Sequence, residues 1–413
     1  MEWQLKTMAD IAEPVNGIVD GPFGSNLKKS DYIDDSENGI PVLTTKNLHG
    51  DYSKDSVRYI SKEKYEVIKR STVYPGDILV AKIGSIGTCG IYPLSCKNAL
   101  IPANLLKITV LPTVDRKYVY YYIQSRGFQE KIKAISTATA QPAFNVTKFR
   151  KLPIPTPPLP EQERIVARIE ELFSQLDAGV ETLKKTKAQL AVYRQAVLKE
   201  AFEGKYTPDV TMHEIKMGEI ADGKDGLRRG PFGSAIKKAF FVESGYKVYE
   251  QGNAINNDCK RGHYYISADK YNELSSFQLR PGDFIVSCSG TIGKIAQLPA
   301  DAEPGVINQA LMRIRLKPDV IDPYYFMMQF RSEVFQRKIV SRGSGMGNLA
   351  GIKEFKLATM FIPENYENQK QIVAEIESRM SVCDSIEQTV DTALQQAESM
   401  RQGILKQAFG GAL

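Results

Sequence analysis

An internal repeat constrains this sequence more than any other feature. Gly21-Pro22-Phe23-Gly24-Ser25 recurs as Gly230-Pro231-Phe232-Gly233-Ser234, and Pro75-Gly76-Asp77 recurs as Pro281-Gly282-Asp283. Further matches continue to the end of the 413-residue chain, at an offset of roughly 207 residues. A self-match of this length predicts one structural unit that is present twice.

Each copy of the repeat has two parts of different character. Residues 1–152 and 212–361 hold short β-branched and aromatic runs separated by Gly, Pro, Asn and Asp, which predicts two compact α+β domains of mixed strands and helices. Residues 153–211 and 362–413 instead carry apolar residues at the three- and four-residue spacing of long helices. We therefore expect two globular domains that alternate with a central and a distal helical segment.

The helical segments predict a pair of long antiparallel helices. The proline-rich joint Leu152–Pro160 must be extended, and no proline interrupts the stretch from Glu161 to Tyr206. Each apolar stripe needs a partner, so we expect the helices to pair in a coiled-coil-like, pseudo-twofold arrangement that separates the domains; the alternative is that each helix only caps its own domain. The stripe residues expected to pair the helices or to dock partners are Ile165, Ile169, Leu172, Leu176, Leu183, Leu190, Ile372, Ile376, Met380, Ile386, Val390 and Leu394.

The positive charge of the chain is concentrated in the two globular segments. Residues 1–152 carry 21 Lys and Arg against 15 Asp and Glu, and residues 212–361 carry 21 against 16, whereas both helical segments are neutral or acidic. Duplicated basic domains are typical of DNA-binding proteins, because contacts to phosphate supply affinity for any sequence.

No pattern in the sequence indicates a reaction of its own. Asp322-Pro323-Tyr324-Tyr325 resembles the adenine-holding element of amino-methyltransferases but lacks its second proline, so we interpret it as a helix start. Gly84–Gly87 and Gly290–Gly293 lack the Gly-Lys-Ser/Thr ending of a nucleotide loop and predict tight turns. Three scattered His and five Cys without a close pair predict neither a metal site nor disulfides, and we expect a reducing cytoplasm with no export.

The repeat also separates candidate DNA contacts into two classes. Residues shared by both copies should frame the fold or grip phosphates, whereas residues that differ at matched positions should read bases, although each has an ordinary-turn alternative. The shared candidates are Phe23, Gly24, Ser25, Lys28, Lys29, Phe232, Gly233, Ser234, Lys237 and Lys238. The base-reading candidates are Thr44, Thr45 and Lys46 against Glu250, Gln251 and Gly252; both segments lead into a common asparagine, Asn47 or Asn253, which is a further candidate DNA contact, and Gln141, Asn145, Arg342 and Asn348 are second-rank candidates.

The chain resembles the DNA-specificity subunit of type I restriction-modification systems. The resemblance rests on the repeated motifs, the Pro-Pro-Leu-Pro exit and the helix start Pro160-Glu161-Gln162-Glu163-Arg164-Ile165. The resemblance covers essentially the whole chain, but the distal exit Phe361–Tyr366 lacks the proline run. It implies two target recognition domains, each for one half of a split site, on helices that dock two modification subunits. It also implies restriction subunits in the full complex, with the methyl donor, ATP and Mg on those partners and no cofactor in this chain.

Two alternatives of other classes remain open from the sequence. One is a scaffold that binds only proteins, with its basic domains incidental. The other is the recognition part of a fused adenine methyltransferase, for which the sequence offers no catalytic motif.

Overall fold

The computed structural model describes residues 3–22, 24, 26–34, 37–53, 56–137, 141–232, 235–341, 348–349 and 351–411. The chain divides into two compact units. Unit 1 comprises Met1–Leu183 and Asp391–Leu413, and unit 2 comprises Lys184–Val390. Each unit therefore joins one globular domain to a segment of both long helices, a grouping that differs from a division into four consecutive segments.

A four-stranded antiparallel sheet forms the centre of the globular domain in unit 1. Its two middle strands are buried along their whole length, so both faces of the sheet carry core residues. Ile78 and Val80 face the side of α2 and α3, whereas Leu79 and Ala81 pack with Leu43 on the other side. In spatial order the strands are β2 (Ile18–Asp20), β10 (Leu105–Ile108), β7 (Ile78–Ala81) and β8 (Cys89–Ile91).

Two further sheets and several short helices complete this domain. The two-stranded sheet pairs β1 (Gln4–Thr7) with β11 (Pro153–Thr156), so most of the proline-rich joint is extended, as predicted. Its last two residues, Leu159 and Pro160, instead begin the first long helix, because proline is tolerated in the first turn of a helix. A five-stranded sheet has the order β3 (Tyr32–Ile33), β5 (Arg58–Ile60), β4 (Ile40–Val42), β9 (Ala99–Leu100) and β6 (Thr72–Val73). The helices are η1 (Lys29–Asp31), η2 (Thr45–His49), α1 (Lys62–Ile68), η4 (Lys69–Ser71), α2 (Arg116–Gln124), α3 (Arg126–Ile135) and α4 (Val146–Arg150).

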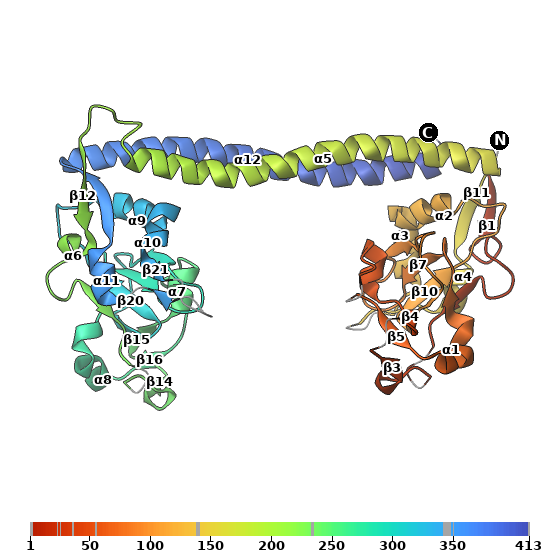
Figure 1. Ribbon diagram of the computed structural model, residues 1–413, viewed down its shortest axis with the longest axis horizontal. Helices are drawn as coiled ribbons and strands as arrows, with labels where there is room; N and C mark the ends of the chain where they lie inside the picture. The colour runs from red at the N-terminus through yellow and green to blue at the C-terminus, as the bar shows by residue number, and fades with distance from the viewer. Residues whose placement is uncertain are drawn as a thin grey trace. The chain divides into compact units, whose positions relative to one another are not determined.

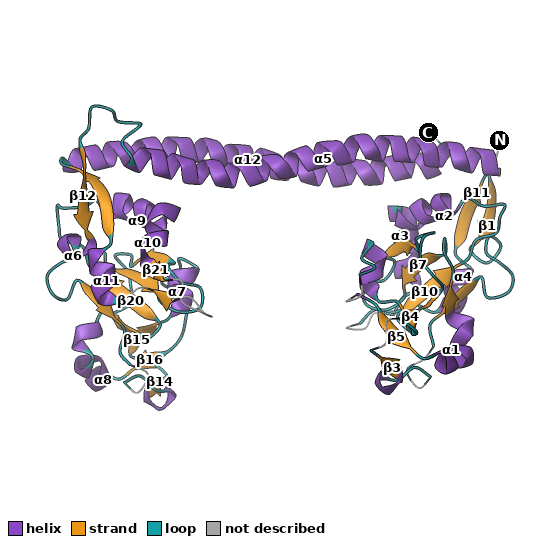
Figure 2. Cartoon of the chain, viewed as in Figure 1, coloured by secondary structure: helices purple, strands orange, loops and turns teal. Residues whose placement is uncertain are grey.

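Unit 2 repeats this topology. Its central sheet has the order β13 (Leu227–Arg229), β20 (Leu311–Ile314), β17 (Phe284–Ser287) and β18 (Ile295–Gln297). Val286 lies opposite Met312, as Val80 lies opposite Leu106 in unit 1, so the strand register is repeated together with the sequence. The predicted fold class, with two similar α+β domains and two long helices, is confirmed (Figure 2).

The remaining elements of unit 2 resemble those of unit 1, except that its second sheet has four strands where that of unit 1 has five, and that it has one further two-stranded pair. The other strands are β12 (Met212–Lys216) paired with β23 (Thr359–Pro363), β14 (Phe241–Val242), β16 (Tyr265–Ile266), β15 (Tyr246–Tyr249) and β19 (Gly305–Ile307) in one sheet, and β21 (Val340–Ser341) paired with β22 (Asn348–Leu349). The helices are α6 (Met217–Ile220), η5 (Lys238–Phe240), α7 (Gln251–Ile255), α8 (Ala268–Glu273), η6 (Ser275–Phe277), α9 (Pro323–Arg331), α10 (Glu333–Ile339) and α11 (Ile352–Leu357).

The two long helices, α5 (Leu159–Phe202) and α12 (Tyr366–Phe409), contain 44 residues each. In unit 1, Ile165 and Ile169 from the start of α5 share a core with Leu405 and Ala408 from the end of α12, and Figure 1 shows these helix ends side by side. In unit 2, the end of α5 packs on the start of α12. The helix segments are therefore antiparallel within each unit. Among the described residues, no helix combines the length and apolar character needed to cross a bilayer.

Most of the predicted stripe residues lie in these helix contacts, with one exception. Ile165, Ile169, Leu190, Ile372, Ile376 and Val390 are buried, and Leu172, Leu176, Leu183, Met380 and Leu394 are half-buried. Ile386 is instead 40 % exposed. The adjacent Glu387 faces α5, where its carboxylate pairs with Lys187 and Arg194, so this turn of α12 presents a charged residue to its partner helix.

A glutamine at the start of each long helix fastens it to the globular domain. Gln162 accepts a hydrogen bond from the Asp115 amide at 2.9 Å and donates one to the Pro157 carbonyl at 2.8 Å. Gln369 accepts from the Asp322 amide at 2.7 Å and donates to the Val320 carbonyl at 3.0 Å. Both glutamines are buried, which explains why the repeat retains them.

The aspartates that these glutamines contact begin helices, as predicted for Asp322. Asp115 caps α2, and Asp322 caps α9 through the amides of Tyr324 and Tyr325. Each of these helices is followed at once by another, because Ser125 and Ser332 end one helix and cap the next.

The Pro-Gly-Asp motif holds a buried charge in each domain. Asp77 pairs with Lys107 at 3.3 Å, and both side chains are only 3 % exposed. Burial lowers the pKa of Lys107, while the Asp77 carboxylate opposes that shift. In unit 2 the matching Asp283 instead binds Arg315 through two hydrogen bonds, at 2.7 and 2.6 Å. The motif is therefore structural in both domains.

We expect Asp77→Ala to lower the free energy of unfolding by about 3–5 kcal/mol, because it leaves the Lys107 ammonium buried and unpaired. The double variant Asp77→Ala with Lys107→Met should recover much of that loss. Urea unfolding monitored by circular dichroism provides the measurement, and Glu66→Ala is the control. Glu66 forms an exposed pair with Lys69, so its loss should change stability by less than about 0.5 kcal/mol. Equal losses for Asp77→Ala and Glu66→Ala would contradict the structural role.

Candidate nucleic-acid interface

The repeated Gly-Pro-Phe-Gly-Ser loop begins with a glycine that the fold requires. A Cβ on Gly21 would collide with the backbone of Pro102, and one on Gly230 would collide with the Asn308 carbonyl. Gly24 is exposed and has no atom of another segment near its missing Cβ. The predicted residues Phe23, Ser25, Gly233 and Ser234 lie outside the described residues.

The lysines after each loop are exposed, as a contact to phosphate requires. Lys28 and Lys29 precede and begin η1, and Lys237 and Lys238 do the same for η5. The amide of Lys28 donates to Asp31 at 2.6 Å, so that carboxylate is used by the turn itself.

The segment with the base-reading candidates leads into an asparagine in each copy, and both asparagines have the same structural role. Asn47 is fully buried, and its amide group donates to the Asp51 carbonyl at 2.6 Å and to Ser56 at 3.2 Å. Asn253 is 2 % exposed and donates to the carbonyls of Asp258 and Arg261. Both side chains are thus occupied in holding their own loops. This shared structural use explains why both copies keep an asparagine here, and a DNA contact by either residue stays a prediction.

The neighbours of these asparagines are more accessible. Lys46 is exposed, and Thr44, Thr45, Glu250 and Gln251 are half-buried. Burial raises the pKa of Glu250, and the nearby His263 partly opposes this shift. Because these accessible residues differ between the two copies, they stay our candidates for base reading at η2 and α7.

The turns expected at Gly84–Gly87 and Gly290–Gly293 lie next to these candidates. Gln251 accepts a hydrogen bond from Ser289 at 3.3 Å, which places α7 against the unit 2 turn. In unit 1, the amide of Gly84 donates to Pro142 at 3.0 Å, so the turn contacts the loop that carries Gln141. Loops far apart in the sequence therefore form one surface in each domain.

The second-rank candidates have mixed placements. Gln141 and Asn145 are exposed, and Asn145 caps α4 by accepting from the Thr147 amide at 2.7 Å. Arg342 lies outside the described residues, and so does the side chain of Asn348, whose backbone forms β22.

One pair of matched positions near these loops differs in charge between the copies, and the sequence analysis did not identify this difference. In unit 1, Asp20 pairs with Lys82 at 2.6 Å. The matching residues of unit 2 are Arg229 and Cys288, and Arg229 donates to the Leu349 carbonyl at 3.5 Å. Burial raises the pKa of the Cys288 thiol to about 11, against the effect of Arg229. Aligning the charged residues of the two copies would have found this sign change.

A hollow at corresponding places in the two domains also differs in chemistry. In unit 1 it has a volume of about 570 Å³, and His49, Tyr52 and Gln124 line it. In unit 2 it has a volume of about 340 Å³, and Lys294 and Arg331 make its lining basic. Burial lowers the pKa of Arg331. The two matched hollows therefore differ both in volume and in the charge of their lining.

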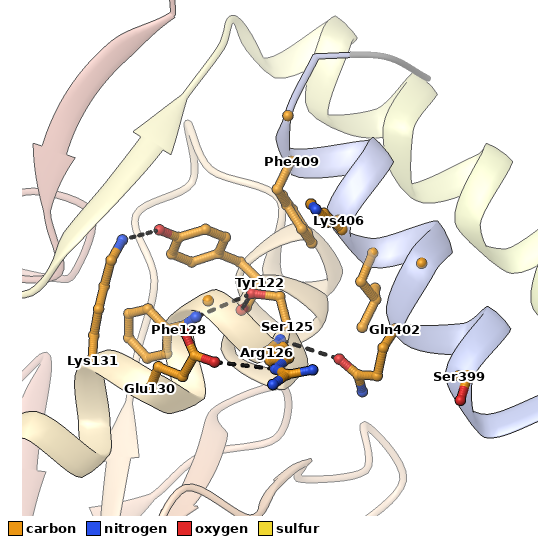
Figure 3. A pocket seen from close by; sticks show the side chains of 14 residues that line it. Tyr122, Ser125, Arg126, Phe128, Glu130, Lys131, Ser399, Gln402, Lys406 and Phe409 are labelled. Carbon is orange, nitrogen blue, oxygen red and sulfur yellow. Dashed lines mark hydrogen bonds and ion pairs between the residues drawn. The ribbon is translucent and has the colours of Figure 1, made fainter. Parts of the chain in front are cut away.

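A pocket in unit 1 lies where the globular domain meets α12 (Figure 3). Gln402 accepts a hydrogen bond from the Arg126 amide at 3.1 Å, and the Phe409 ring meets Tyr122 edge-on at 5.1 Å. The volume is about 620 Å³, against about 50 Å³ at the matching place in unit 2. Gly127 and Gly403 line the pocket, where unit 2 has the larger Val334 and Ala196.

Comparison with known proteins gives consistent findings. The family model described as "Type I restriction modification DNA specificity domain" matches residues 2–191 and 228–396. The chain is 24 % identical to the type I restriction enzyme EcoBI specificity subunit of Escherichia coli, over 100 % of this chain and 86 % of the relative. It is 23 % identical to the EcoKI specificity subunit of Escherichia coli strain K12, over 100 % of this chain and 89 % of the relative.

Solved structures agree on the fold. A chain from a study of complex assembly and conformational transition of the type I R-M system has a TM-score of 0.67 at 15 % identity, covering 100 % of this chain and 98 % of that one. The HsdS subunit from Thermoanaerobacter tengcongensis has a TM-score of 0.53 at 15 % identity, covering 100 % and 97 %. At this identity the likeness shows the fold alone.

We expect Asn47→Ala to lower the free energy of unfolding by about 1–3 kcal/mol, because it leaves buried polar groups of its loop without partners. Lys46→Ala, one residue away and exposed, should change stability by less than about 0.5 kcal/mol. Urea unfolding of the two variants beside the unsubstituted chain tests this. A neutral Asn47→Ala would contradict the structural role of this asparagine.

Proposed function

This chain belongs to the family of type I restriction-modification DNA specificity domains and recognises DNA, and we propose that each of its globular domains reads one half of a bipartite site. The observation that supports this most strongly is the repeat itself. The two domains share sheet order and strand register, whereas accessible residues at matched loops differ. A common framework with different surface residues suits the reading of two different half-sites.

The division of roles follows from exposure. The exposed lysines Lys28, Lys29, Lys237 and Lys238 occur in both copies and suit phosphates, which every half-site offers. Lys46 in one copy, and Glu250 with Gln251 in the other, have the donors and acceptors that base edges discriminate. We assign base reading to the second group, supported by Gln141 and Asn145 in unit 1.

The long helices supply the second part of the proposal, which is to dock two modification subunits and to set the spacer between half-sites. Several apolar side chains on them remain exposed, although each helix already has an apolar partner. Exposed apolar groups of this kind indicate a protein contact. They are Val192, Tyr193, Val382, Ile386 and Met400, between 40 % and 72 % exposed.

In this proposal the chain itself is not catalytic. The modification subunits bring the methyl donor and the adenine-methylating site, and restriction subunits bring ATP- and Mg-dependent cleavage. We place the complex in the prokaryotic cytoplasm, where the five free cysteines stay reduced.

Exchange of residues 1–152 for the recognition domain of another specificity subunit should change one half-site and leave the other intact. Each domain has its own core and its own loop surface, so the readings should be independent. Sequencing of methylated adenines in cells that also carry the modification subunit measures both half-sites and the spacer. Loss of both half-sites after the exchange would contradict independent reading.

Shortening both helices by about two turns, or about seven residues each, should shorten the preferred spacer without altering the half-sites. The deletions should be centred on Lys187 in α5 and Glu387 in α12, which pair with one another, so that helix pairing stays in phase. The same sequencing of methylated adenines gives the result. An unchanged spacer would refute this role of the helices, and a deletion in α5 alone serves as the mismatched control.

A further inference from the structure

Phe232 is the most exposed large hydrophobic side chain among the described residues, at 89 %. It lies in the loop after β13, where its carbonyl accepts a hydrogen bond from the Ala235 amide at 2.9 Å. The backbone therefore turns at this residue while the ring packs on almost nothing. A phenylalanine stabilises a fold by burying its ring, and this ring is not buried. Stability of the fold therefore does not account for a phenylalanine at this position.

The internal repeat shows that this ring is not incidental. Phe232 belongs to a five-residue segment that recurs unchanged at 21–25, although the loops that follow differ between the copies. The first glycine of each segment is explained by the close approach of Pro102 or Asn308. Phe232 has no such explanation, so the occurrence of a phenylalanine at this place in both copies of the sequence indicates a target that both copies share.

Charge around the loop narrows that target. Residues 226–240 contain four Lys and Arg and no Asp or Glu. Lys237 and Lys238 are exposed, and Arg229 lies three residues before the ring. Two half-sites of different sequence have in common their phosphates, their sugars and the faces of their stacked bases. Cations bind the phosphates, but a phenyl ring has no polar group and fits only a base face or an apolar edge.

We propose that Phe232 enters the duplex at one base step of its own half-site and stacks on a base there, while the flanking cations hold the adjacent phosphates. The proposal rests on the DNA-reading function proposed above and adds a contact that is independent of sequence. Every base has a π-face, so one ring can serve half-sites of any composition. Apolar side chains that open a base step in this way also kink the duplex.

The test uses the full chain assembled with its modification subunits. The duplex contains the recognition site that sequencing of methylated adenines identifies. The fluorescent base 2-aminopurine, which brightens when it unstacks, replaces one base at a time in each half-site. We expect the unsubstituted complex to brighten at one step of the half-site read by residues 212–361. Phe232→Ala should remove that signal and weaken binding by about 5- to 150-fold, whereas Phe232→Tyr should keep both.

Three comparisons separate this result from trivial causes. The melting temperature of Phe232→Ala should equal that of the parent, because the ring is exposed. Leu357→Ala removes another exposed apolar side chain of unit 2, 65 % exposed, and should leave signal and affinity unchanged. Lys237→Ala should reduce the salt dependence of binding but retain the brightening.

A Phe232→Ala complex that binds as tightly as the parent and brightens at the same step would overturn the proposal, as would a parent complex that brightens at no step. A parent complex that binds duplex DNA with no preference for a split site would instead overturn the proposed function. In that case the Phe232→Ala comparison on the same duplex would still decide whether the ring stacks.

Discussion

Each globular domain depends on being bound to both long helices at once. In unit 1, Gln162 fastens the start of α5 to the amide that begins α2, while Phe409 at the end of α12 packs edge-on against Tyr118. In unit 2, Gln369 of α12 and Phe202 of α5 make the equivalent contacts, the latter with Tyr325. Each contact involves a buried polar group or a large aromatic surface. A recognition domain held at two points cannot pivot on one linker, so its loops have a defined direction relative to the helices beside it.

The buried aspartate of the Pro-Gly-Asp motif has a different cationic partner in each copy. Asp77 and Asp283 occupy the same turn, but Lys107 satisfies the first and Arg315 the second. The residue of unit 2 that matches Lys107 is Arg313, whose guanidinium donates to the backbone carbonyls of Gln278 and Asp225. Burial, together with the nearby Arg315, lowers the pKa of Arg313 to about 10. The carboxylate is the same in both copies, whereas its cationic partner in unit 2 lies two residues further along the chain. The repeat therefore preserves the turn and not a particular ion pair.

The sequence predicted the parts of this structure that arise from long patterns. The repeat, the apolar spacing and the absence of proline were sufficient for α5 and α12, because many residues contribute to each of those signals. Single side chains were harder. Asn47 and Lys46 are both polar residues of one short segment, and only the path of the loop back to Asp51 and Ser56 determines that the first is buried and the second exposed. Ile386 fits the apolar spacing, but the pairing of Glu387 across the helices was not visible in that spacing.

The repeat becomes most informative when identity between the copies is compared with burial. Shared residues that are buried, such as Gln162 and Gln369, need no explanation beyond the fold. Residues that differ and are accessible, such as the exposed Lys46 and the half-buried Gln251, are those that we propose to read different targets. A third class is shared and exposed, and a feature common to both targets would retain it. In our proposals that feature is phosphate for the lysines after each loop, and the apolar face of the stacked bases for Phe232.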